Sequence, residues 1–149
     1  MSLNVHVPNS AEQSTGVGEL SGFKIMMVED DAFFTDIIMT KLVSHGCIPF
    51  STATGADALS LAKLYEPDLI ILDLMLPVLS GEEILQQLKA NDALKHIPVI
   101  VFSNKSEQTD IEANLQAGAA EYLVKSATDF NTLVDIVKGT ILKARQAQA

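Results

Sequence analysis

Four consecutive aliphatic residues, Leu69 to Leu72, are the feature that most constrains the fold of this chain. Because strand side chains alternate between the two faces of a sheet, an apolar run without alternation indicates a strand buried on both faces. Such strands are typical of parallel sheets that are covered by helices on each side. The run ends on a carboxylate, Asp73, and four residues later comes Pro77, which cannot continue the hydrogen bonding of a strand.

Similar apolar runs alternate with amphipathic segments along the rest of the chain. We expect strands at 24–28, 48–53, 69–72, 97–103 and 121–125, and helices that begin near residues 31, 55, 81, 106 and 129. Asp31 is expected to cap the first helix, whose apolar stripe includes Phe34, and the fourth helix has a thin apolar stripe, mainly Ile111 and Leu115. The last helix is expected to end near Arg145. Five strands interleaved with five helices predict an α/β protein built on one doubly wound parallel sheet, with helices on both faces. We expect a single domain at 23–145, after a disordered tail or linker at 1–22 and before a short tail at 146–149.

Acidic residues follow two of the expected strands. Glu29, Asp30 and Asp31 come directly after the strand at 24–28, and Asp73 comes directly after Leu72. The carboxyl ends of parallel strands meet at one edge of a sheet, so three or four carboxylates are expected to converge there, where such sheets bind ligands. Like charges repel at that distance unless a cation is present, and an all-oxygen ligand set favours Mg²⁺. Taken alone, Asp73 is equally compatible with an ordinary turn or capping residue.

Charge and cysteine content narrow the possible partners and the location. The formal net charge of −9 argues against the basic surface that binding to nucleic acid or to an anionic membrane requires. No apolar run is long enough to span a bilayer. The lone Cys47 excludes an internal disulfide and favours a reducing, cytoplasmic location, and its apolar neighbours indicate a buried core residue.

Four strand-end segments together resemble the signature of response-regulator receiver domains. They are Val28-Glu29-Asp30-Asp31, Leu72 to Pro77 with Gly81, Ile100 to Ser103, and Tyr122 to Lys125. Each segment is weak alone, but all four occur in the family's order, and the resemblance runs from about residue 23 to 144. It implies a flavodoxin-like sheet with strand order 2-1-3-4-5.

The resemblance also implies a function for the strand-end residues. Asp73 is expected to accept a phosphoryl group from the phosphohistidine of a sensor histidine kinase or of a histidine phosphotransfer protein, with Mg²⁺ as cofactor. Lys125 and Ser103 are expected to contact the phosphoryl group, and Ser103 and Tyr122 to form a conformational switch. The expected metal ligands are Glu29 (through water), Asp30, Asp73 and the backbone carbonyl of Met75. The surface of the fourth helix, fifth strand and fifth helix is expected to control a downstream protein, without direct contact to nucleic acid or membrane.

Several residues depart from the family pattern. Ser126 stands where the family usually has a proline, often after a cis bond, which leaves the aim of Lys125 open. Asn104 replaces a small residue, and Ser103 stands where threonine is commoner but keeps the hydroxyl. Met75 and Lys105 occupy positions that influence loss of the phosphoryl group in this family. Because an apolar Met75 side chain cannot orient an attacking water, we predict slow self-dephosphorylation.

Two other interpretations compete with a phosphoacceptor signalling domain that promotes its own phosphorylation and dephosphorylation. A degenerate receiver would keep the fold and act as a phosphorylation-independent interaction module, but Glu29, Asp30, Asp73 and Lys125 are all in place. The second alternative is an enzyme with the same fold. A haloacid dehalogenase would need a second aspartate where Met75 stands. A flavodoxin would need a hydroxyl-rich phosphate loop where this chain is acidic, and no P-loop signature is found.

Overall fold

The structure is a computed structural model that describes residues 20–148, so most of the tail expected at 1–22 lies outside the described residues. Five strands and five α-helices alternate, as the apolar pattern predicts. The strands are β1 (Lys24–Val28), β2 (Ile48–Thr52), β3 (Leu69–Leu72), β4 (Val99–Ser103) and β5 (Glu121–Val124). The helices are α1 (Ala32–Ser44), α2 (Gly55–Tyr65), α3 (Gly81–Ala90), α4 (Gln108–Gln116) and α5 (Phe130–Gln148), and the 3-10 turn η2 (Lys125–Ala127) follows β5.

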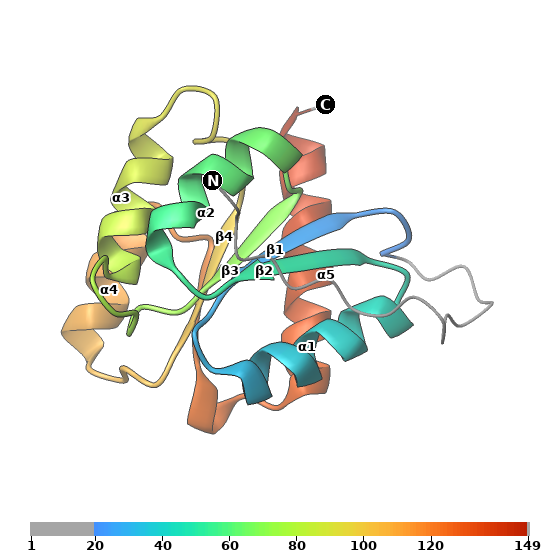
Figure 1. Ribbon diagram of the computed structural model, residues 1–149, viewed down its shortest axis with the longest axis horizontal. Helices are drawn as coiled ribbons and strands as arrows, with labels where there is room; N and C mark the ends of the chain where they lie inside the picture. Colours follow the sequence, from blue (N-terminus) through green and yellow to red (C-terminus); the bar gives the residue numbers. More distant parts are fainter. Residues whose placement is uncertain (1–19, 149) are drawn as a thin grey trace.

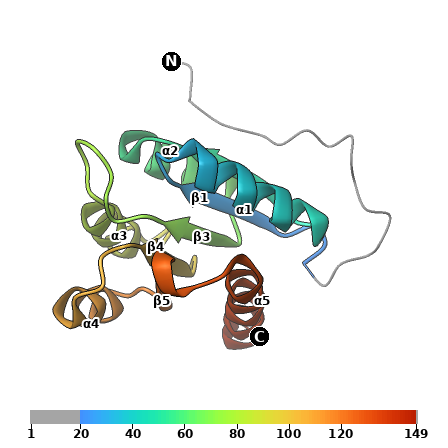
Figure 2. The ribbon, with the colours of Figure 1, turned by 90° about the horizontal axis from the view of Figure 1, so that it is seen from below.

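The five strands form one parallel sheet in the order β2-β1-β3-β4-β5, which confirms the doubly wound, flavodoxin-like fold. Helices cover both faces of the sheet. In Figure 1, α2, α3 and α4 lie on one side of the strands, and α1 and α5 lie on the other. Seen from below in Figure 2, the last strand, β5, runs between α4 and α5.

The side chains of β3 explain why its sequence does not alternate. Leu69 and Ile71 belong to the apolar cluster beneath α1 and α5, whereas Ile70 and Leu72 belong to the cluster beneath α2 and α3. All four are at most 1% exposed, because β3 is the central strand and both of its faces are covered. The unbroken apolar run therefore records a strand with no polar face, and the residue that follows it enters a buried environment.

Side-chain caps begin the two helices that follow acidic strand ends. Asp31 accepts hydrogen bonds from the backbone amides of Phe33 (2.9 Å) and Phe34 (3.3 Å) and so caps α1, as predicted. Ser80 caps α3 by accepting from the amide of Glu83 at 3.3 Å. Such caps satisfy amide groups that a helix start leaves without partners, which fixes where each helix leaves its preceding loop.

One of the two outer edges of the sheet is formed by β2, which contains a proline. The Ile48 amide donates to the Phe23 carbonyl and the Thr52 carbonyl accepts from the Glu29 amide, so alternate residues of β2 face β1. The backbone nitrogen of Pro49, which lies between these positions, points away from β1 and toward the open edge of the sheet. A proline is tolerated at this position because its missing N–H is not required by the neighbouring strand.

Some boundaries and packing details differ from the sequence expectations. The strand expected from Ile97 begins at Val99, after Pro98, and α5 continues to Gln148, beyond the expected end near Arg145. Leu20, which the sequence assigns to the tail, is buried against α1 and α5. Leu115 was expected to face inward from α4 but is 42% exposed, and Asn114 is the residue that α4 buries. The side-chain amide of Asn114 donates to the Asp110 carbonyl one turn earlier, which satisfies this polar group in its buried position.

Within residues 20–148, no helix combines the length and apolar character needed to cross a membrane.

Candidate functional site

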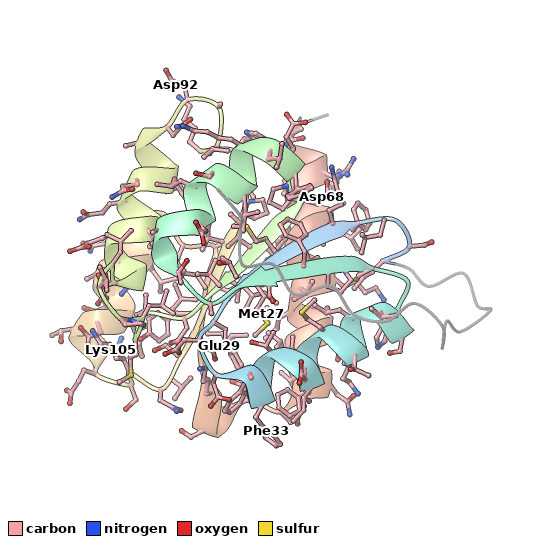
Figure 3. The ribbon with its side chains drawn as sticks, viewed as in Figure 1. Met27, Glu29, Phe33, Asp68, Asp92 and Lys105 are labelled. Carbon is pink, nitrogen blue, oxygen red and sulfur yellow. The ribbon has the colours of Figure 1, made fainter. Side chains whose placement is uncertain are left out.

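The carboxylates that follow β1 and β3 meet at the carboxyl edge of the sheet. The Asp73 amide donates to the Val28 carbonyl (3.0 Å), and the Glu29 amide donates to the Thr52 carbonyl (3.1 Å). Each acidic residue is thus held by the strand next to its own. One carboxylate oxygen from each of Glu29, Asp30 and Asp73 lies within 4.8 Å of the others. Figure 3 shows Glu29 at this edge and Asp68, which precedes β3, at the opposite end of the sheet.

Lys125, the first residue of the turn η2, brings a positive charge to these carboxylates. Its ammonium contacts Glu29 Oε1 directly and lies 3.2 Å from Asp73 Oδ2. All three side chains are buried, with exposed fractions of 7% or less. Within residues 20–148 no peptide bond is cis, so Lys125 reaches the site with a trans bond to Ser126. The proline expected from the family pattern is therefore not needed for this orientation.

An aromatic ring supports the Lys125 ammonium from the other side. The Nζ atom lies 4.8 Å from the centroid of the Phe34 ring, and the Phe102 ring lies 5.9 Å away. A cation over an aromatic face is attracted by the ring quadrupole, and the attraction is larger when the cation is desolvated. Sequence reasoning placed Phe34 only in the apolar stripe of α1, and nothing in the sequence signals its contact with a lysine 91 positions later.

The two buried carboxyl groups differ in protonation. Burial raises the pKa of Glu29 to about 8, the neighbouring Asp73 carboxylate acts in the same direction, and Lys125 opposes the shift. Burial alone would raise the pKa of Asp73, but the hydrogen bonds from Glu29 and the Met75 amide and the charge of Lys125 outweigh it and lower the pKa. Burial would likewise lower the pKa of Lys125, but its carboxylate partners raise it. Without a metal ion, the two carboxyl groups therefore share a proton that Glu29 holds more firmly than Asp73.

The loop between β3 and α3 fixes the position of Asp73. The Met75 amide donates to Asp73 Oδ1 at 3.2 Å, while the Met75 side chain points outward and is 58% exposed. Gly81 packs against the Asp73 backbone so closely that an added Cβ would lie 2.3 Å from the Asp73 carbonyl oxygen. Val78, at the tip of the loop, has a φ of +68° and a fully exposed side chain. The left-handed backbone at Val78 and the close contact of Gly81 together make this loop tight beside the carboxylates.

Ser103 and Tyr122, the two expected switch residues, both contact Lys105. Ser103 ends β4 and is fully buried, and its hydroxyl oxygen accepts from the Lys105 amide at 3.3 Å. The Tyr122 hydroxyl donates to the Lys105 carbonyl at 2.7 Å. The Tyr122 ring is half-buried against the apolar cluster on the α2 and α3 face. The structure thus brings Glu29, Asp30, Asp73 and Lys125 together, and links Ser103 and Tyr122 through a third residue.

The acidic cluster has the chemistry of a site for a hard cation. Glu29 Oε2 is buried and has no hydrogen-bond partner among the described residues, although buried polar atoms are normally satisfied. A divalent ion beside Glu29, Asp30 and Asp73 would satisfy this oxygen and replace the shared proton. Oxygen ligands of this kind fit hard divalent ions such as Mg²⁺ better than soft transition-metal ions, which prefer nitrogen and sulfur ligands. The residues present therefore fit the metal that the sequence predicts.

Together these features define a metal-binding acidic pocket at the carboxyl edge of a five-stranded parallel sheet, with a lysine and a buried hydroxyl-bearing residue beside it. Residues 25–138 match the family described as the response regulator receiver domain. The chain belongs to this family, whose members are signalling modules of two-component systems.

Relatives and solved structures agree with this family. The polar-differentiation response regulator DivK of Brucella anthropi is 36% identical over 101 residues, which are 68% of this chain and 82% of that protein. The probable transcriptional regulator ycf29 of Pyropia yezoensis is 36% identical over 121 residues, which are 81% of this chain but only 54% of that protein. This chain therefore spans about half the length of the Pyropia relative.

Among solved structures, the receiver domain of the sensor histidine kinase PA1611 from Pseudomonas aeruginosa aligns with a TM-score of 0.73 at 30% identity. The alignment covers 81% of this chain and 98% of that domain, whose active-site cleft holds a magnesium ion. A CheY-like receiver domain protein from Methanospirillum hungatei has the same fold, with a TM-score of 0.79 at 21% identity.

Proposed function

We propose that this protein is a phosphoacceptor: Asp73 takes a phosphoryl group from a phosphohistidine donor in a Mg²⁺-dependent reaction. The observation that carries the proposal is the arrangement around Asp73. It is the carboxylate that remains ionised, its Oδ1 accepts from the Met75 amide, and its Oδ2 lies 3.2 Å from the Lys125 ammonium. An ionised oxygen that is oriented by fixed donors is a suitable nucleophile for group transfer.

In the proposed reaction an Asp73 carboxylate oxygen attacks phosphorus, the P–N bond to the donor imidazole breaks, and an acyl phosphate forms. The Lys125 ammonium stabilises the negative charge of the phosphoryl oxygens, and the Ser103 hydroxyl donates a hydrogen bond to one of them. Glu29, Asp30, Asp73 and the Met75 carbonyl would hold Mg²⁺. When bound, this ion supplies charge neutralisation to the phosphoryl oxygens. In the proposed self-dephosphorylation, water attacks phosphorus, the P–O bond to the Asp73 carboxylate breaks, and inorganic phosphate leaves while Asp73 is regenerated.

The donor is proposed to be a sensor histidine kinase or a histidine phosphotransfer protein, as for receiver domains in general. The mouth of the pocket suits a protein donor, because its rim carries exposed apolar side chains. Phe33 is 70% exposed in the first turn of α1, where Figure 3 shows it pointing outward, and Met75 and Val78 are exposed on the opposite loop. Exposed apolar groups around a polar site are typical of protein contacts.

The output is proposed to pass through the surface of α4, β5 and α5 to a downstream protein. α4 buries a single residue, Asn114, and all four residues of β5 are half-buried, so these two elements are less buried than the other helices and strands. Elements with few buried contacts rearrange at lower cost. The acidic chain is proposed to act without nucleic acid or membrane, in a reducing cytoplasm compatible with its single buried thiol, Cys47.

The test is intact-mass measurement after incubation with acetyl phosphate and Mg²⁺. We expect a gain of one phosphoryl group that Asp73→Asn abolishes. Asp68→Asn is the matched control, since Asp68 precedes the same strand at the other edge of the sheet and must leave the gain unchanged. No gain in the unaltered protein would contradict the proposal and favour a phosphorylation-independent interaction module.

The lifetime of the phosphorylated form tests the part assigned to Met75. Its side chain is exposed and carries no group that orients water, so we propose slow self-dephosphorylation. Mass measurement at intervals after removal of acetyl phosphate gives the lifetime, and a lifetime of only seconds would contradict this part of the proposal.

A further inference from the structure

The Lys125 ammonium lies between two carboxylates and two aromatic rings. Among residues 20–148 it donates to Glu29 Oε1 and to Asp73 Oδ2, so two of its three N–H groups are used. The nearer ring is that of Phe34, whose centroid lies 4.8 Å from Nζ, against 5.9 Å for Phe102. The face of Phe34 is therefore the contact available to the third N–H group.

The backbone that carries Lys125 gives its side chain little support. Lys125 begins the turn η2, and the next two residues, Ser126 and Ala127, are exposed. The turn is closed by a hydrogen bond from the Thr128 amide to the Lys125 carbonyl that is 3.5 Å long, and bonds of this length are weak. Ser126, where the receiver family usually has a proline, adds no ring that would stiffen the backbone. The direction of the Lys125 side chain thus depends on the groups around its ammonium.

Phe34, in contrast, is fixed from several sides. Its amide donates to the Asp31 side chain at 3.3 Å, so the cap of α1 sets the position of its backbone. Its ring packs edge-on against Phe102 of β4 (centroids 6.4 Å apart) and against Phe130 of α5 (6.1 Å). Figure 1 shows that α1 and α5 cover the same face of the sheet. Phe34 therefore presents a rigid ring to a lysine that stands on a loosely closed turn.

We infer that Phe34 is a positioning residue whose ring holds the Lys125 ammonium beside Asp73, where a phosphoryl group would be received. This inference rests on the proposed function. Glu29, the other close partner of the ammonium, is also an expected metal ligand, so a bound ion would compete with Lys125 for this carboxylate. The Phe34 ring is not a metal ligand. Its contact with the ammonium is therefore the one that remains when Glu29 turns toward the ion.

The strength of the contact sets the size of the expected effect. A desolvated ammonium over an aromatic face is favoured by about 2- to 30-fold in its equilibrium constant. Fluorine atoms on the ring withdraw electron density from its face and weaken this attraction in steps, while the ring keeps nearly the same size and the same apolar packing. Phe34→Leu removes the aromatic face altogether.

The experiment places phenylalanine with one, two or three fluorine atoms at position 34 by site-specific incorporation. The matched control is the same series at Phe130, whose ring packs against Phe34 but makes no cation contact among residues 20–148. The first measurement is the exchange of the Lys125 ammonium protons with water, followed by NMR of ¹⁵N-lysine-labelled protein without metal, and Lys125→Met identifies the signal. We expect exchange to become faster with each fluorine at position 34, up to about 2- to 30-fold in Phe34→Leu. The series at Phe130 is expected to leave it unchanged.

The second measurement is the rate of phosphorylation by acetyl phosphate with Mg²⁺, read by intact mass. The rate is expected to fall in the same order across the Phe34 series, by up to the same factor. Constant exchange across the Phe34 series, equal changes in the two series, or a constant phosphorylation rate despite faster exchange would each overturn the positioning role. If the unaltered protein gains no phosphoryl group, the proposed function fails, whereas the exchange series still decides whether Phe34 fixes Lys125.

Discussion

A single added methyl group is expected to have opposite effects at Gly81 and at Gly139. At Gly81 a Cβ would lie 2.3 Å from the Asp73 carbonyl oxygen and 2.5 Å from the Leu74 Cα. Both neighbours are backbone atoms that cannot rotate aside, so the β3–α3 loop has to shift. Such overpacking costs about 2 to 3 kcal/mol of unfolding free energy. At Gly139, inside α5, an added Cβ meets nothing within 4 Å, and alanine gains about 0.5 to 1 kcal/mol from helix propensity.

Thermal and urea unfolding of Gly81→Ala and Gly139→Ala measure these free energies. For a domain of this size the first substitution is expected to lower Tm by about 6 to 12 °C, and the second to raise it by a few degrees. Because the strained atoms belong to Asp73, Gly81→Ala is also expected to weaken Mg²⁺ binding, measured by titration calorimetry, whereas Gly139→Ala leaves it unchanged. A Gly81→Ala protein as stable as the unaltered one would refute the packing argument.

Three further predictions concern buried titratable groups. Because the pKa of Glu29 is raised to about 8, the free energy of unfolding of the metal-free protein is expected to fall as pH rises from about 4.5 through 8. Mg²⁺ affinity is expected to rise by up to about tenfold per pH unit below 8, because the ion displaces a proton. A Mg²⁺ affinity that stays constant between pH 6 and about 8 would contradict this. Lys125→Met leaves two buried carboxyl groups without their cation, so urea unfolding without Mg²⁺ is expected to show a loss of about 3 kcal/mol at pH 8 and less at pH 6, where Glu29 is protonated. Burial raises the pKa of Cys47 to about 12, so iodoacetamide is expected to label the unfolded protein but not the folded one, as read by mass.

The sequence predicted the elements that depend on local pattern. The double burial of β3, the cap at Asp31 and the polar residues at the strand ends all follow from apolar runs and from residues near them in sequence. The strand order came from the family resemblance alone, because periodicity does not say which strands are neighbours. The family signature likewise predicted that Lys125 belongs to the acidic pocket, although the pair Lys125 and Glu29 is separated by 96 positions.

Contacts between side chains distant in sequence that the family signature does not contain were not predicted. The ion pair of Lys105 with Glu82 joins the loop after β4 to the first turn of α3, 23 positions apart in sequence, and no local pattern pairs the two residues. Leu115 was expected inside because it belongs, with Ile111, to the apolar stripe of α4, but the helix turns Asn114 inward, where its amide bonds to the helix's own backbone. Local propensity does not contain this information, since the packing of neighbouring elements decides it.

Pro49 has a consequence for encounters between separate molecules. An unprotected outermost strand offers a ladder of free amides and carbonyls to which any extended polypeptide can attach, and this is a common start of fibril growth. At β2 the second residue, Pro49, has no amide hydrogen, so an added strand would find one hydrogen-bond donor missing. An extended segment is therefore less able to add a further strand along this side of the sheet.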